Sequence, residues 1–278
     1  MKQVSFSQLM TYVRCPEHYL FRYKLGIKLQ PRKVFKHGFA FHETLQYHLE
    51  QKKENGKGIK LADAQEFFVN SFGNALEDYR QELEEARPFL TREYLSKERS
   101  INIADMIENG LKGLVVYFQQ LDPSIQPDLV EESFTFSAGP RLELMGRIDL
   151  VDARGVIHDF KTTRITPNKQ DIASDAQLAI YQIGYKAITG KSPKGISKDY
   201  IVLSKKPKIA QFRVVHPFVD KNTVLRNIAI IMDAVKHNIF YCLHPSESWI
   251  CSKEWCAYYK LHQELKKIGL ERFMERYS

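Results

Sequence analysis

Residues 142–162 alternate apolar and polar side chains on both sides of a glycine, and this stretch constrains the fold more than any other part of the sequence. Such alternation is typical of strands, and a glycine between two strands is typical of a hairpin turn. If residues 153–155 form the loop, Asp149 lies directly opposite Asp159. The stretch therefore predicts a hairpin that brings two carboxylates together.

The same alternation places a lysine beside the two carboxylates. Side chains along a strand point in turn to opposite faces, so Asp159 and Lys161 share one face and Phe160 points into the core. Paired carboxylates are costly unless a cation neutralises them, and hard oxygen ligands suit Mg²⁺ or Mn²⁺. A neighbouring lysine is placed to hold or deprotonate an attacking water. The alternative is a surface hairpin whose Asp and Lys side chains form cross-strand ion pairs, and the hairpin alone favours neither interpretation.

Helical patterns flank this hairpin in the sequence. Phe41, Leu45 and Leu49 recur at helical spacing and predict a helix over residues 39–51. Residues 61–122 predict long helices, with Pro88 as the clearest break. Further helices are predicted over residues 173–187 and 220–238, and further strands over residues 130–136, 198–204 and 211–215.

This order of elements predicts an α/β fold, a mixed central sheet flanked by helices, in a single domain over residues 1–278. We expect a helical elaboration at about 55–125, a core at about 126–216 and a C-terminal helical, cysteine-bearing cover at 217–278. The 44% hydrophobic content is enough for a buried core. No apolar run reaches the ~20 residues that cross a bilayer, and no signal segment opens the chain, so we expect a cytoplasmic protein.

The charge of the chain favours a polyanionic partner. Forty-one Lys and Arg against 33 Asp and Glu give a formal net charge of +8, as in many nucleic-acid-binding proteins. The excess is spread along the chain, so an ordinary basic surface is the alternative. No glycine-rich P-loop motif is present, and the chain itself therefore supplies no ATP motor.

Three polar residues outside the hairpin are candidates for the same site. His42 follows Gly38 by one helical turn, and Gln177 and Tyr181 are four residues apart, on the same side of a helix. Without further context, a hydrogen-bonded structural histidine and a polar edge on a buried helix are the simpler interpretations.

Taken together, these motifs resemble the RecB-like nucleases of the PD-(D/E)XK superfamily, which include CRISPR-associated and phage single-domain exonucleases. The resemblance covers most of the chain. Its parts are Ser5-Phe6-Ser7, Cys15-Pro16 with Tyr19 and Tyr23, Gly38 to His42 as G-x-x-x-H, Gly146 to Asp149 as G-x-x-D, Asp159-Phe160-Lys161 as D-x-K, and Gln177 to Tyr181 as Q-x-x-x-Y.

The resemblance implies a restriction-endonuclease-like core and a role for each matching residue. His42, Asp149 and Asp159 would bind a divalent metal, and the carbonyl of Phe160 would complete its shell. Lys161 would position the hydrolytic water and stabilise the developing charge. Gln177 and Tyr181 would orient the D-x-K strand or contact the DNA backbone. Either Glu131 or Glu132 would be an additional acidic group.

The function implied by the resemblance is that of a deoxyribonuclease that uses Mg²⁺ or Mn²⁺ to hydrolyse phosphodiester bonds. We expect an exonuclease acting on single-stranded or frayed DNA ends, because basic grooves and aromatic side chains accept any sequence. The alternative is a catalytically silent or partner-dependent nucleic-acid-binding subunit of a recombination, repair or CRISPR-adaptation complex. The sequence does not indicate the polarity of cleavage or a preference for DNA over RNA. It also does not indicate protein partners or the oligomeric state.

The cysteines suggest a second metal site. Cys15, Cys242, Cys251 and Cys256 are too few and too unevenly placed for a secreted disulfide framework. Many relatives hold a 4Fe-4S cluster with one cysteine near the N-terminus and three near the C-terminus, but the tail here departs from the usual C-x-x-C spacing.

Several interpretations of the tail remain open. All four cysteines could bind a cluster, or His262 could replace a third tail cysteine and leave Cys242 uninvolved. Zinc is a further alternative. We favour thiols without a metal, packed among Trp249, Trp255 and Tyr258, and we expect the tail to fold back on the N-terminal segment.

Overall fold

The computed structural model of the protein describes residues 2–168, 175–214, 220–242 and 248–277 and divides the chain into two units. Each unit combines separate stretches of sequence, so the consecutive segments expected from the sequence do not coincide with the units. The single domain over residues 1–278 stays a prediction. The first unit comprises Met1–Phe6, Lys36–Ala75 and Ile103–Asn227, and the second comprises Ser7–Phe35, Leu76–Asn102 and Ile228–Ser278.

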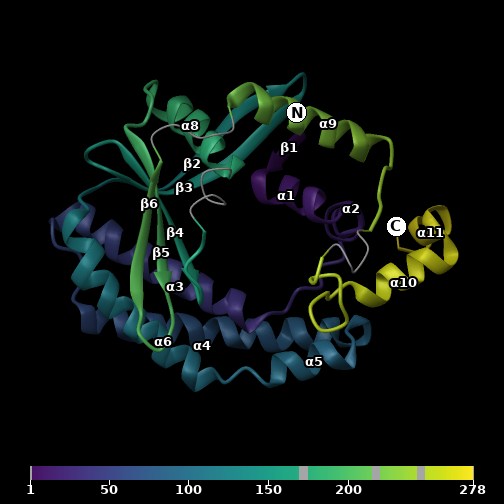
Figure 1. Cartoon of the computed structure of the whole chain (residues 1–278), viewed down its shortest axis with the longest axis horizontal. Helices are drawn as coiled ribbons and strands as arrows, with labels where there is room; N and C mark the ends of the chain where they lie inside the picture. Colours follow the sequence, from purple (N-terminus) through teal and green to yellow (C-terminus); the bar gives the residue numbers. More distant parts are fainter. Residues whose placement is uncertain (1, 169–174, 215–219, 243–247, 278) are drawn as a thin grey trace. The chain divides into compact units, whose positions relative to one another are not determined.

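A mixed sheet forms the centre of the first unit (Figure 1). Within the described residues it has six strands in the order β1-β3-β4-β5-β6, and β2 pairs with β3. β1 runs parallel to β3 and β4 parallel to β5, whereas the other pairs are antiparallel. The strands are β1 (Lys2–Ser5), β2 (Pro127–Gly139), β3 (Leu142–Asp152), β4 (Val156–Thr163), β5 (Gly195–Val202) and β6 (Lys208–Val214).

Helices pack on the sheet, as the sequence predicted. Close packing against α6 (Ile103–Val116) depends on Gly113, where a Cβ atom would lie 2.4 Å from Leu203 Cδ2 and 3.4 Å from Ile201 Cγ2 on β5. α3 (Lys33–Asn55) contributes Phe41, which is fully buried and lies against the same glycine. These apolar contacts bury the side of the sheet toward which Phe160 points.

α8 (Ala176–Thr189) packs against β2 and β3 through an aromatic side chain. The ring of Phe134 lies over Gly146 on β3 and Gly184 on α8, so a Cβ at either glycine would clash with it. Asp175 caps the helix by accepting a hydrogen bond from the backbone N–H of Gln177 at 2.8 Å. The cap fixes the start of the helix and thereby the direction in which its first turns point.

The predicted helices and strands are largely confirmed, with shifts at their ends. The helix expected over residues 39–51 begins at Lys33 and ends at Asn55, because amphipathic spacing marks only the buried part of a helix. Residues 173 and 174 of one predicted helix and residue 215 of one predicted strand lie outside the described residues. The break at Pro88 is confirmed as a 3₁₀ turn (Arg87–Phe89) between α4 (Leu61–Ala86) and α5 (Arg92–Arg99).

The second unit has its own apolar core, built by the N-terminal helices, α5 and the C-terminal helices. Besides α5 and the part of α4 that begins at Leu76, this unit contains α1 (Phe6–Arg14), α2 (Pro16–Tyr19), part of α9 (Lys221–Lys236), α10 (Tyr259–Ile268) and α11 (Leu270–Tyr277). Tyr258 is buried there, accepting a hydrogen bond from Leu29 N–H and donating one to the carbonyl of Ile27, each at 3.0 Å. The tail therefore packs on the N-terminal segment, as expected.

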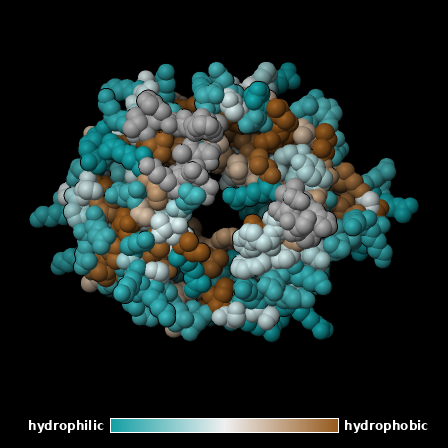
Figure 2. All heavy atoms as spheres, in the orientation of Figure 1, coloured by the Kyte–Doolittle hydropathy of each residue, from teal (hydrophilic) through white to brown (hydrophobic). Residues whose placement is uncertain are grey.

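Polar side chains dominate the face of the molecule in Figure 2, and apolar ones form scattered patches among them. Among the described residues, none of the helices combines the length and the apolar character that crossing a membrane requires.

Candidate active site

The hairpin of β3 and β4 sets the two central aspartates face to face. Leu150 pairs with His158 in the antiparallel ladder, and this register places Asp149 directly opposite Asp159. Gly155 occupies the turn with φ of 78°, a left-handed conformation that glycine adopts without steric cost. The register predicted from the alternating sequence is confirmed.

A third carboxylate continues the row onto β2. Glu132 pairs with Ile148, and the same register places Glu131 opposite Asp149. Glu131 has φ of 50°, a left-handed conformation that costs an L-residue on the order of 1 kcal/mol. Its side chain is 11% exposed and ion-paired with Arg147 Nε at 2.6 Å, and burial raises its pKa. Of the two glutamates that the sequence left open, Glu131 is therefore the one beside the aspartates.

Asp159 is fully buried and partly unsatisfied. Its Oδ1 accepts hydrogen bonds from Lys161 Nζ and from the Tyr181 hydroxyl, both at 2.7 Å. Its Oδ2 lies 3.7 Å from Lys198 Nζ and has no hydrogen-bond partner among the described residues. Burial would raise the pKa of Asp159, but the charges of Lys161 and Lys198 hold it below its ordinary value. A buried, ionised oxygen without a hydrogen bond has the chemistry of a metal ligand.

The pKa of Asp149 is raised by this arrangement. Its Oδ2 accepts a hydrogen bond from Phe160 N–H at 3.0 Å. Burial, followed by the negative charge of Asp159, raises the pKa of Asp149 to about 7. Two adjacent carboxylates cannot both ionise cheaply in a buried site, and a divalent cation relieves the repulsion between them. The donor set therefore fits a hard metal ion.

His42 approaches this pair of aspartates from α3. Its Nδ1 lies 3.9 Å from Asp149 Oδ2, and its ring hydrogen-bonds the backbone of Phe160. Burial and the charge of Lys161 lower its pKa to about 4, so the imidazole is neutral at pH 7. A neutral imidazole keeps a lone pair for a metal.

The glycine one turn before His42 has a steric role. A Cβ on Gly38 would lie 3.4 Å from Thr162 Oγ1 at the end of β4. A glycine at this position leaves space for the helix to approach the strand that carries Asp159 and Lys161. The G-x-x-x-H spacing thus has a packing reason in addition to the position of the histidine.

The Q-x-x-x-Y residues form a chain of hydrogen bonds that ends on Asp159. Gln177 Nε2 donates to the Tyr181 hydroxyl at 2.8 Å, and that hydroxyl donates to Asp159. Sequence reasoning missed Lys198, which pairs with Asp159 across β4 and β5 and is ion-paired with Asp175. Its signal was a lysine within an apolar strand, but only the parallel register shows which carboxylate it faces.

The predicted cysteines belong to the second unit. The sulfurs of Cys15 and Cys242 and a ring nitrogen of His262 lie within 4.8 Å of one another. Cys242 is thus close to Cys15 and His262, and its part in metal binding stays a prediction.

The model of the PD-(D/E)XK nuclease superfamily matches residues 3–261. No curated protein matches the chain. Among solved structures, a protein of Eubacterium rectale provisionally named an exonuclease is 11% identical, with 86% of this chain and 83% of that chain covered and a TM-score of 0.48. The protein SSO0001 is 18% identical, covering 59% of this chain and 77% of its own, with a TM-score of 0.33. Because the superfamily model spans nearly the whole sequence, this chain belongs to the PD-(D/E)XK nuclease superfamily.

Proposed function

We propose that the protein is a deoxyribonuclease that hydrolyses phosphodiester bonds with Mg²⁺ or Mn²⁺ bound between Asp149 and Asp159. The observation that carries the proposal is the buried, ionised Oδ2 of Asp159, which lies beside a second carboxylate and accepts no hydrogen bond from the part of the chain that the structure describes. An ion there would take its other ligands from His42 Nδ1 or Nε2 and the carbonyl of Phe160. Membership of the superfamily supports the same choice of a divalent metal.

Each residue of the site has a distinct role in the proposed reaction. An ion held by Asp149 and Asp159 would supply Lewis-acid chemistry for the phosphoryl oxygen and for activation of a water molecule. Burial would lower the pKa of Lys161, but the charges of Asp159 and Asp149 raise it. Lys161 is therefore protonated at pH 7, and it orients the water and stabilises negative charge on the phosphate rather than acting as a base. Tyr181 and Gln177 are positioning residues that hold Asp159 in place.

The surroundings of the site support a single-stranded DNA substrate. Arg147 is 61% exposed beside Glu131, where its guanidinium is available to a phosphate. Phe39 is 57% exposed and precedes His42 by three residues on α3, so the ring lies on the same side of the helix. Exposed aromatic rings stack on unpaired bases without regard to sequence. With the RecB-like motifs, these features favour an exonuclease on single-stranded or frayed ends.

The test compares degradation of end-labelled linear and closed circular single-stranded DNA in Mg²⁺, in Mn²⁺ and in chelator. Asp159→Ala should abolish cleavage, whereas Asp63→Asn, which removes an exposed carboxylate on α4, should leave it unchanged. Loss of the linear strand alone supports an exonuclease, and the label gives its polarity. Loss of both substrates contradicts the exonuclease assignment, and no cleavage by the folded protein favours the catalytically silent or partner-dependent alternative.

A further inference from the structure

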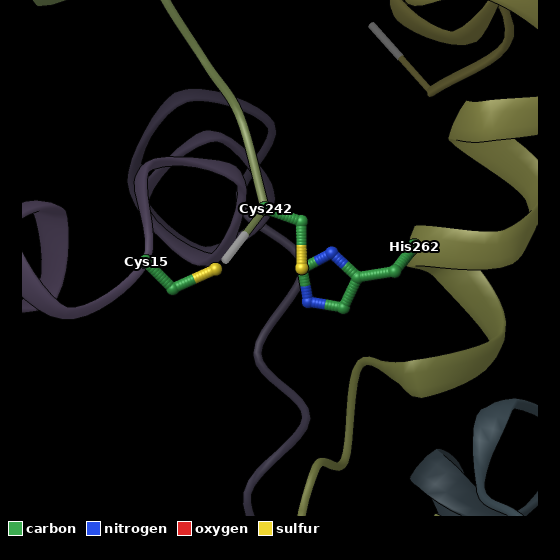
Figure 3. Close-up of side chains that lie close together, drawn as sticks. All are labelled: Cys15, Cys242 and His262. Atoms are coloured by element: carbon green, nitrogen blue, oxygen red, sulfur yellow. The ribbon is translucent and has the colours of Figure 1, made fainter. Parts of the chain in front are cut away.

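A group of soft metal ligands lies in the second unit (Figure 3). Cys15 precedes α2, Cys242 lies after α9, and His262 lies on α10. Their ligand atoms all fall within 4.8 Å of one another, with Cys15 and His262 buried and Cys242 exposed. Segments that are far apart in the sequence thus bring two thiols and an imidazole to one point.

A carboxylate orients the imidazole of this group. His262 Nδ1 hydrogen-bonds Glu17 Oε2 at 2.5 Å, which leaves Nε2 as the ring nitrogen available to a ligand. Metal-binding histidines commonly have such a carboxylate on their other nitrogen, because it fixes the tautomer and makes the ligand more basic. Glu17 N–H also donates to the carbonyl of Tyr241 at 3.3 Å, so the segment that carries Cys242 is tied to the segment that follows Cys15.

Two further thiols lie next to the group. Cys256 lies close enough to His262, and Cys251 close enough to Cys242, for each pair to interact. A pocket of about 470 Å³ is lined by Glu17, Cys242, Cys251 and His262, among others, and gives an ion a route to the exposed thiol. The group therefore has room for an ion and a choice of two sulfurs for a fourth ligand.

The spacing of the ligand atoms suits one ion better than an iron–sulfur cluster. Zinc–sulfur bonds are about 2.3 Å and zinc–nitrogen bonds about 2.0 Å, so the ligands of one tetrahedral ion lie roughly 3.5 to 4 Å apart. In a 4Fe-4S cluster each cysteine binds a different iron, which places the sulfurs farther from one another. The two thiols and the imidazole have their ligand atoms within 4.8 Å of one another. This spacing is too close for the 4Fe-4S cluster that the family resemblance implied.

We propose that Cys15, Cys242 and His262 bind a single zinc ion, with either Cys251 or Cys256 as the fourth ligand. The set of three thiolates and one imidazole is that of a closed structural zinc site, which has no open position for substrate. The ion joins the N-terminal segment to the tail and stabilises the second unit. This replaces our expectation from sequence that the tail holds thiols without a metal.

The first test measures metal and acid-labile sulfide in the full-length protein, purified without metal-affinity resin and under reducing conditions. We expect about one zinc per chain, without stoichiometric iron. His262→Gln and Cys15→Ser should lose most of the zinc, whereas His237→Gln, which replaces an exposed histidine just after α9, should retain it. Iron and sulfide in equal, stoichiometric amounts would overturn the single-ion site.

The fourth ligand gives a second test. Of Cys251→Ser and Cys256→Ser, only one should lose zinc, and loss in both or in neither contradicts a site with four ligands. If variants fail to fold, Co²⁺ substitution of the parent protein keeps the proposal testable, because tetrahedral thiolate coordination gives intense visible and near-ultraviolet bands. A chain that takes up neither zinc nor cobalt when fully reduced, or that holds Cys15 and Cys242 in a disulfide, refutes the proposal.

Discussion

Replacing Asp149 by Asn should stabilise the metal-free protein above pH 7. Burial and the charge of Asp159 raise the pKa of Asp149 to about 7 in the folded state, against about 3.9 in an unfolded chain. The folded state therefore binds this proton more tightly than the unfolded state. The contribution of the Asp149 proton to the free energy of unfolding is fully present below about pH 3.9. It is lost as the pH rises and is absent above about pH 7. Asparagine keeps the shape of the side chain and an oxygen for Phe160 N–H but carries no charge.

The size of the effect follows from the shift in pKa. A difference of about 3 pH units corresponds to roughly 4 kcal/mol at about 1.4 kcal/mol per unit. Because the Asp149 side chain is 16% exposed and solvent screens part of the penalty, we expect about 2 kcal/mol. For a chain of this size, that raises Tm by roughly 4 to 6 °C.

Thermal unfolding followed by circular dichroism measures the effect. Parent and Asp149→Asn proteins receive the same chelator treatment and are compared at pH 5 and at pH 8.5. The variant should be more stable than the parent at pH 8.5. The difference in stability between the two proteins should fall by more than half at pH 5, because the ionised Asp149 destabilises the parent less at that pH. Mg²⁺ should reduce the difference in stability between the two proteins, because it stabilises the parent more than the variant. A variant that is less stable than the parent at pH 8.5, or an advantage independent of pH, would refute this reasoning.

Three further predictions follow from the same contacts. Asp159→Asn should weaken Mn²⁺ binding at least tenfold in calorimetric titration, and unchanged affinity would show that Asp159 is no ligand. Tyr181→Phe removes the hydrogen bond to Asp159 and should lower kcat by about tenfold with little change in Tm; equal kcat values would exclude the positioning role. Gly184→Ala would place a Cβ 2.6 Å from the ring of Phe134 and should lower the free energy of unfolding by about 1 to 3 kcal/mol. Urea denaturation measures this change, and an unchanged midpoint would disprove it.

The central hairpin could be predicted because local features set it. Side-chain alternation assigns each residue to a face, and a loop that ends at Gly155 fixes the register. Once Asp149 and Asp159 are opposite each other, Lys161 follows from the period of the strand. The helical position of His42 likewise follows from the spacing of the apolar residues after it.

The remaining contacts depend on pairings that no local pattern contains. Lys198 reaches Asp159 only through the parallel pairing of β4 and β5, and Glu131 rather than Glu132 lies opposite Asp149 only through the register of β2 on β3. The spacing of the tail cysteines departs from cluster motifs and does not indicate which residues lie close to them in the fold. Proximity to Cys15 and His262 arises only when the second unit folds.

The most direct test of a catalytic role for this site is the single-turnover rate of DNA cleavage by Lys161→Ala in saturating Mg²⁺. Among the described residues, Lys161 is the cation nearest Asp159, with its Nζ 2.7 Å from Asp159 Oδ1, and in the proposed mechanism it stabilises negative charge on the phosphate. The proposed mechanism predicts a loss of at least about a hundredfold in a variant that remains folded and still binds Mn²⁺. A folded Lys161→Ala protein that cuts as fast as the parent would contradict it.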